Sequence, residues 1–220
     1  MAIIHRTTVT PGKLELLAGW LPAQPWYAGG ARPDPAKAGG FRLDDPAGEV
    51  GIEFMLVTEG EGAAARAYQV PLTYRGAPLE GAEAGLVGTT EHGVLGRRWV
   101  YDGTHDPVCA AQLLALFRGE VAAQAQNESD VPDPTVVVLP GPVPGTVEGA
   151  TRPVHGEDAT VLAVDTAAGP VPLTVVRVLR PAAGADLPAG AAARIEAGWR
   201  LPDGAEVRGT LAVLGGDAAG

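Results

Sequence analysis

The sequence has 220 residues, with 16 basic and 26 acidic side chains and a formal net charge of -10. Binding to nucleic acid or to an anionic membrane surface requires clustered Lys and Arg, so this balance argues against both partners. No apolar run is long enough for a membrane helix, and the single Cys109 excludes an intrachain disulfide. Hydrophobic residues make up 46% of the chain, which is enough for a buried core. We therefore expect a soluble, cytoplasmic protein.

Short elements are expected along the first half of the chain. Residues 3–8 predict a strand, and residues 14–20 fit one or two turns of a helix that Pro22 ends. Residues 51–58 and 65–74 are rich in β-branched and aromatic side chains and predict strands. A further strand is expected at residues 94–101.

The clearest helix signal runs from residue 107 to residue 124. Asp106 is a suitable N-cap, and Pro107 suits the first helical position. Apolar side chains follow at helical spacing, at Ala110, Leu113, Leu114, Phe117 and Val121. A polar, Pro-punctuated stretch follows this helix. The sequence therefore predicts three parts: a domain at 1–126, a Pro/Gly-rich linker at 127–149 and an antiparallel β module at 150–220.

The C-terminal part has the pattern of an antiparallel sheet. Val-rich strands are expected at residues 159–165 and 173–179. Alternation at residues 195–201 and 207–213, on either side of a Pro-Asp-Gly turn, predicts a hairpin with one buried face. Sheets in both parts with few helices indicate an α+β fold.

Few motifs indicate catalysis. Residues 155–158 (HGED) are similar to the catalytic loop of small-molecule kinases, in which an Asn five residues after the Asp holds a metal. Counting five from Glu157 and Asp158 gives Leu162 and Ala163, which cannot ligate magnesium. We interpret the segment as a solvated turn before a strand.

Metal and nucleophile signals are also weak. Glu91-His92 and His105-Asp106 are neighbours in sequence, and adjacent strand residues point to opposite faces, so we predict no metal site. A helix N-terminus could lower the pKa of the Cys109 thiol, but no general base is indicated and a packed side chain is expected. The glycine pairs at 29–30 and 39–40 lack the strand–helix context of a dinucleotide site.

One stretch gathers Arg, aromatic and His side chains in a chain that is otherwise acidic and poor in aromatics. Arg and Trp are enriched at interface hot spots. The candidate binding residues are therefore Tyr74, Arg75, His92, Arg97, Arg98 and Trp99. In the alternative interpretation, Trp99 and Tyr101 fill the core while the two arginines flank them.

Three segments resemble the actinobacterial maltokinase N-terminal cap domain. They are residues 20–30 (WLPAQPWYAGG), 70–75 (VPLTYR) and 88–103 (GTTEHGVLGRRWVYDG). The resemblance covers about residues 1–126 and implies a curved antiparallel sheet with flanking helices. It also implies that the following β module resembles a degenerate kinase N-lobe. In such kinases the cap precedes the ATP-binding lobe of an enzyme that phosphorylates maltose or a related sugar in trehalose–glycogen metabolism.

The sequence departs from the kinase pattern at several places. Pro25 and Gly30 stand where the opening motif has basic residues, and Arg177 replaces the ATP-contacting Lys of the lobe strand. The hairpin at 195–213 stands where a kinase places a helix, and the chain ends at Gly220 before a catalytic lobe. We therefore expect no kinase activity of its own.

Three functional hypotheses follow from these observations. The first is a non-catalytic binding or regulatory protein of trehalose, maltose or α-glucan metabolism, without cofactor or metal. Its expected partners are trehalose synthase, a sugar kinase or a maltooligosaccharide. The second is a non-catalytic subunit that completes a split sugar kinase, in which Arg177 would matter for ATP contacts. The third is a glucan-processing enzyme that uses paired carboxylates such as Asp44 and Glu53.

Overall fold

The computed structural model describes residues 8–126, 131–139, 141, 143, 147–150, 152–167, 169–182 and 191–215. The strand expected at residues 3–8 lies outside the described residues except for Thr8, and the first described strand is Val9–Thr10. Part of the expected linker at 127–149 also lies outside them.

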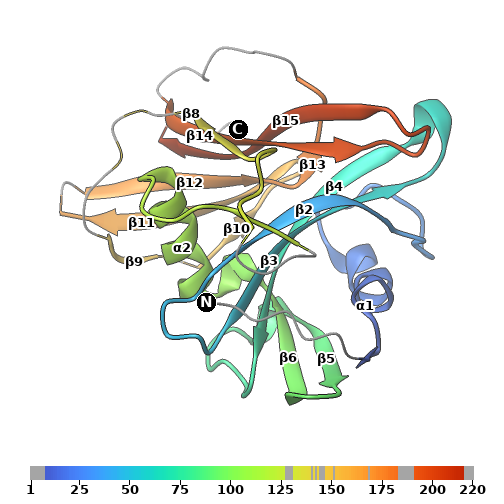
Figure 1. Ribbon diagram of the computed structural model, residues 1–220, viewed down its shortest axis with the longest axis horizontal. Coiled ribbons are helices and arrows are strands. Elements are labelled where there is room, and N and C mark those ends of the chain that lie inside the picture. The colour runs from blue at the N-terminus through green and yellow to red at the C-terminus, as the bar shows by residue number, and fades with distance from the viewer. Residues whose placement is uncertain are drawn as a thin grey trace.

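The described residues form two antiparallel sheets (Figure 1). The strands of sheet A are β1 (Val9–Thr10), β2 (Ala36–Leu43), β3 (Gly51–Glu59), β4 (Arg66–Arg75), β5 (Leu86–His92), β6 (Gly96–Asp102), β7 (Gln124–Ala125) and β13 (Val178–Leu179). Those of sheet B are β8 (Val137–Leu139), β9 (Val147–Ala150), β10 (Val154–His155), β11 (Ala159–Thr166), β12 (Gly169–Val176), β14 (Ala191–Arg200) and β15 (Glu206–Gly215). Sheet A has the order β1-β5-β6-β4-β3-β2-β7 with β13 paired to β4, and sheet B has the order β10-β11-β12-β15-β14-β8 with β9 paired to β11.

Two α-helices occur in the described part of the chain, α1 (Lys13–Trp20) and α2 (Pro107–Phe117). Short 3-10 helices are η1 (Leu21–Ala23), η2 (Gly62–Ala64), η3 (Glu83–Gly85) and η4 (Gly103–His105). The fold is therefore mostly β, which corrects the expected α+β class. The expected curved antiparallel sheet with flanking helices is present as sheet A. Helix α2 ends before residue 124 because Gly119 adopts a φ of +69° and its N–H bonds to the carbonyl of Leu116.

Several expected elements are confirmed. Helix α1 occupies the range expected at 14–20, and strands β3, β4, β6 and β11 occupy their expected segments within a few residues. Asp106 caps α2, since its carboxylate accepts a hydrogen bond from the Val108 N–H at 3.0 Å. Strands β14 and β15 form the expected hairpin, and the Leu201 N–H donates to the Ala205 carbonyl across its turn at 2.9 Å.

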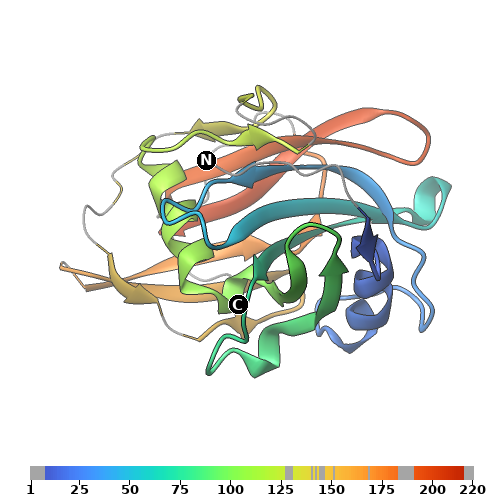
Figure 2. The ribbon, with the colours of Figure 1, turned by 60° about the horizontal axis from the view of Figure 1, so that its bottom comes forward.

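Sheet A is covered on both faces, as the side chains of β3 show. Ile52, Phe54 and Leu56 belong to a core shared with α2 and sheet B. Met55 and Val57 alternate with them and belong to a second core with α1, η1 and Trp26. Figure 2 shows the blue-to-green strands of sheet A beside the orange and red strands of sheet B, with α1 away from the latter. The larger core therefore joins the two sheets.

The glycine pair at 39–40 lies in β2 and has a structural role. A Cβ on Gly39 would lie 3.2 Å from the carbonyl oxygen of Gly198 in β14, so the missing side chain allows the two sheets to approach closely. Gly40 has a φ of +129°, and a Cβ there would lie 2.2 Å from the carbonyl oxygen of Phe54. These short distances explain why glycine occupies both positions in a strand, where glycine is normally disfavoured.

The strand expected at 173–179 is divided between the two sheets. Strand β12 ends at Val176 in sheet B, and β13 pairs with β4 of sheet A through Val178 opposite Tyr68 and Leu179 opposite Ala67. Arg177 stands at the crossing, where its N–H donates to the Asp158 carbonyl and its carbonyl accepts from the Gln69 N–H. The change of partner sheet at this residue corrects the expectation of one continuous strand.

Candidate functional site

A pocket of about 420 Å³ opens beside α1, between the β2–β3 loop and the β5–β6 hairpin. Its lining includes three of the candidate binding residues, Tyr74, His92 and Arg98. The pocket therefore brings together residues from β4, β5 and β6 that are separate in the sequence.

The other three candidates do not line this pocket. Arg75 binds the Asp106 carboxylate through two hydrogen bonds of 2.7 Å, and Asp106 also caps α2. Arg97 pairs with the exposed Glu91 at 2.8 Å, and Trp99 is half-buried on β6. Successive strand residues point to opposite faces, so neighbours such as Arg97 and Arg98 need not share a surface. Tyr101, which the alternative interpretation placed in the core, is buried.

A buried carboxylate lies in the wall of the pocket. Glu53 is 5% exposed and accepts hydrogen bonds from Lys13 Nζ at 2.5 Å, Tyr74 Oη at 2.9 Å and Gln126 Nε2 at 3.0 Å. Burial, together with the negative charge of Glu53, raises the pKa of Tyr74 well above its ordinary value. The Tyr74 hydroxyl therefore stays protonated and serves as a hydrogen-bond donor across the physiological pH range.

The β2–β3 loop forms one rim of the pocket and is folded by Asp45. The buried Asp45 carboxylate accepts backbone N–H groups of Ala47, Glu49 and Val50 at 3.1, 2.9 and 2.9 Å. These three hydrogen bonds lie within the loop itself, so the loop conformation does not depend on contacts with the β5–β6 side of the pocket. Sequence analysis did not identify the rim, because its residues form a turn whose partners are backbone atoms.

The pocket residues that sequence analysis missed carry both signs of charge. Lys13 and Arg42 join Arg98 as cations, and Glu49 joins Asp45 and Glu53 as carboxylates, along the same lining. Sequence analysis did name Glu53, a charged residue inside the apolar segment 51–58, but only as a carboxylate paired with Asp44. Asp44, its expected partner in acid–base work, accepts from Gln124 Nε2 at 2.8 Å and is absent from the pocket lining.

Arg177 is fully buried and holds the two sheets together. Its Nε donates to Thr160 Oγ1 at 2.8 Å, and its Nη2 donates to Thr104 Oγ1 at 3.0 Å and to the buried Asp102 carboxylate. The guanidinium carbon lies 5.0 Å from the centre of the Trp26 ring. These partners surround the residue that sequence analysis compared with the ATP-contacting Lys of a kinase lobe.

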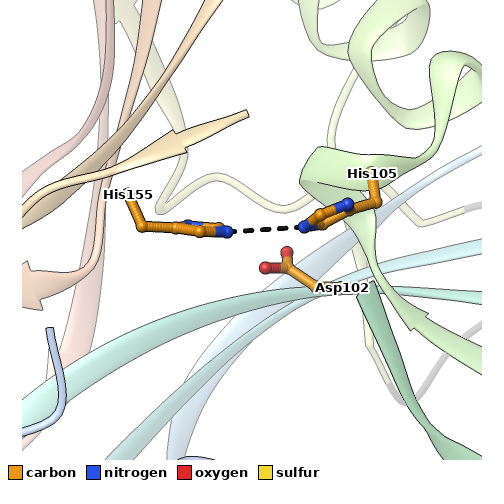
Figure 3. Close-up of side chains that lie close together, drawn as sticks. All are labelled: Asp102, His105 and His155. Carbon is orange, nitrogen blue, oxygen red and sulfur yellow. Dashed lines mark hydrogen bonds between the residues drawn. The ribbon is translucent and has the colours of Figure 1, made fainter. Parts of the chain in front are cut away.

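Beside Arg177, three potential metal ligands converge from distant parts of the chain. Figure 3 shows the imidazoles of His105 and His155 edge to edge above the Asp102 carboxylate. The two Nε2 atoms are 3.4 Å apart, and one ligand atom from each of the three residues lies within 4.8 Å of the others. Burial is the main cause that lowers the pKa of both imidazoles. Sequence analysis compared adjacent residues only, and no local signal pairs His105 with His155.

The other motif residues have structural positions. Residues 156–158 form the expected turn between β10 and β11, closed by the Gly156 N–H to the Ala159 carbonyl at 2.8 Å, while His155 before it is half-buried. Cys109 is buried in α2, and burial raises the pKa of its thiol well above the ordinary value. The low-pKa nucleophile considered for Cys109 is therefore not formed.

A comparison with protein families matches one part of the chain to a known family. Residues 20–106 match the family model described as the maltokinase N-terminal cap domain. The matched range runs from the end of α1 to the N-cap of α2 and contains Tyr74, His92 and Arg98 of the pocket. Within the described residues, no helix combines the length and apolar character needed to cross a membrane. Residues 20–106 are therefore similar to the maltokinase N-terminal cap domain, and the match covers less than half of the chain.

Proposed function

We propose that the protein is a non-catalytic binding protein of α-glucan metabolism that holds a maltooligosaccharide in the pocket beside Glu53. The proposal rests on one observation, which is that the lining of this pocket contains both cationic and carboxylate side chains around Tyr74. A sugar hydroxyl both donates and accepts hydrogen bonds, so a neutral polyol matches a lining of both charge signs. The relation of residues 20–106 to a maltokinase cap supports this ligand class.

Arg98 is the side chain on which we base the test. It is half-buried on β6, its Nη2 donates to the Leu95 carbonyl at 3.0 Å, and its Nε is buried without a hydrogen-bond partner among the described residues. The hydrogen bond to Leu95 fixes the guanidinium next to the turn that joins β5 and β6. A sugar hydroxyl that accepts from this guanidinium would form a charge-assisted hydrogen bond.

The alternative subunit of a split sugar kinase receives less support. That hypothesis relies on contacts between Arg177 and ATP, whereas Arg177 is fully buried against Asp102, Thr104, Thr160 and Trp26. The glucan-processing alternative relies on Asp44 and Glu53, of which only Glu53 lines the pocket. The proposal also includes trehalose synthase and a sugar kinase as protein partners, which would pass the glucan to the protein or take it from the protein.

Calorimetric titration with maltose, maltotriose and longer maltooligosaccharides tests the binding proposal. We expect Arg98→Ala to weaken binding about 10- to 150-fold, because a hydrogen bond to a charged group contributes about 1.5–3 kcal/mol. Tyr74→Phe removes one hydroxyl and should weaken binding by a smaller factor.

Arg97→Ala is the matched control, since Arg97 is adjacent on β6 but exposed and paired with Glu91. It should bind as the unchanged protein does, and a β-linked glucan of equal length should bind more weakly. No heat of binding with any maltooligosaccharide would refute the proposal, and so would equal losses in Arg97→Ala and Arg98→Ala. Parallel titrations with trehalose synthase and a maltokinase test the protein partners.

A further inference from the structure

We propose that Asp102, His105 and His155 bind one divalent transition-metal ion such as Zn²⁺, and that this ion links residues 102–105 to sheet B. The proposal concerns a different part of the molecule from the pocket and does not depend on sugar binding. Asp102 ends β6 and His105 lies in η4, both inside the matched range 20–106, whereas His155 belongs to β10 of sheet B. Such an ion would therefore bridge the two sheets.

The spacing of the imidazoles suits a tetrahedral ion. Zn–N distances of about 2.0–2.1 Å place two nitrogen ligands of a tetrahedron about 3.3 Å apart. His105 Nε2 and His155 Nε2 are 3.4 Å apart, and the Asp102 carboxylate lies against the gap between them (Figure 3). The two Nε2 atoms now face each other in a hydrogen bond, so to bind one ion both imidazoles would turn until their lone pairs converge on a point beside the line that joins them.

Neighbouring groups already orient these three side chains. His155 Nδ1 lies 2.9 Å from Thr160 Oγ1, which fixes the imidazole plane in the way that outer partners of metal-bound His commonly do. Asp102 is held through Oδ2 by Arg177 and through Oδ1 by the Thr104 N–H at 3.1 Å. Arg177 also places a positive charge beside the site. We therefore expect weaker affinity than that of a closed four-ligand zinc site.

The ligand types and their exposure indicate which ions would bind. Imidazole together with carboxylate suits Zn²⁺, Co²⁺ and related ions, whereas Mg²⁺ and Ca²⁺ prefer ligand sets made of oxygen. Asp102 is buried, but His105 and His155 are half-buried. Water can therefore complete the coordination, as it does in sites that have three protein ligands.

The test uses the 220-residue chain without a His tag. The chain is stripped of metal with EDTA and then titrated with Zn²⁺ by calorimetry and with Co²⁺ by visible absorption. We expect one ion per chain and the absorption of a low-coordinate Co²⁺ centre. His105→Ala and His155→Ala should each weaken binding at least tenfold. Zn²⁺ should raise the Tm of the unchanged protein, because a ligand that binds only the folded state stabilises it.

His92→Ala is the matched control, because His92 lies on β5 and lines the pocket instead. It should bind Zn²⁺ as the unchanged protein does, and Mg²⁺ should not change the Tm of any variant. If an Ala variant fails to fold in EDTA, His155→Gln retains a polar side chain and should fold without Zn²⁺-dependent stabilisation. No binding to the unchanged protein would refute the proposal. Undiminished binding to the folded His105 and His155 variants would refute it equally.

Discussion

The ion pair between Arg177 and Asp102 connects the two sheets through two side chains with no exposed surface. Removing a charge from solvent costs several kcal/mol, and here the cost is offset by hydrogen bonds to Thr104 and Thr160 and by the Trp26 ring. The arrangement is sensitive to the loss of one partner, because the other would stay buried without its counter-charge.

We expect Arg177→Ala to lower the free energy of unfolding by about 3–5 kcal/mol, since it leaves the Asp102 carboxylate uncompensated in the core. Urea denaturation followed by circular dichroism measures the change. Arg180→Ala is the control, because the Arg180–Asp158 pair at 2.9 Å has exposed fractions of 69% and 49%. Surface pairs contribute about 0–1 kcal/mol, so similar losses in the two variants would contradict this account of Arg177.

At the scale of the element, strand β2 contains two adjacent glycines, a residue type that is uncommon inside strands. Gly39 allows contact with β14, and Gly40 adopts a backbone conformation that other residues rarely occupy. The irregularity is local, since β2 pairs with β3 on one side and with β7 on the other. The glycines therefore shape the strand for its position between sheets.

Gly40→Ala should destabilise the protein by about 1–3 kcal/mol, because Ala at this φ is strained and its Cβ would meet the Phe54 carbonyl. The urea midpoint measures the effect. Gly30→Ala is the comparison, since a Cβ at the exposed Gly30 meets no atom within 4 Å. We expect a change below about 0.5 kcal/mol there. A neutral Gly40→Ala would show that β2 relaxes easily.

The elements that sequence could predict are those with strong local signals. Asp106 and Pro107 predicted the start of α2, and alternation around a Pro-Asp-Gly turn predicted the β14–β15 hairpin. Strand β2 has Ala and two adjacent glycines in place of alternation, so its packing against β14 decides its conformation.

The candidate site was only partly predictable for a similar reason. Tyr74, His92 and Arg98 were identifiable as an unusual local composition, but which neighbours share their face depends on strand register. The cluster of His105 with His155 depends on the packing of two sheets, and the residues are 50 positions apart.

At the scale of the whole molecule, one core extends from β2 and β3 through α2 to the inner faces of sheet B. Leu173 on β12 is fully buried in this core, together with Trp199 of β14. Trp26 belongs to the second core, on the far face of sheet A. The two tryptophans therefore report on opposite ends of the layered structure.

We expect the two cores to unfold together. With 5-fluorotryptophan labelling, fluorine NMR should give the same urea midpoint for Trp26 and Trp199, as a cooperative transition requires. Leu173→Ala should lower both midpoints together, because truncating a buried Leu costs about 2–5 kcal/mol. Val154→Ala, at a side chain that is 70% exposed, should leave both unchanged. If Leu173→Ala left the Trp26 midpoint unchanged, the result would instead indicate that the two cores unfold independently.

The pairing of β13 with β4 has a consequence for how this protein can be divided or recombined. The backbone beside Ala67 and Tyr68 receives its neighbouring strand from residues 178–179, far outside the family match. A fragment cut after residue 126 would leave this edge without its partner strand, and unpaired edges promote association between chains. In a gene fusion, residues 20–106 would therefore have to keep strand β13 or receive an equivalent strand from the protein to which they are fused.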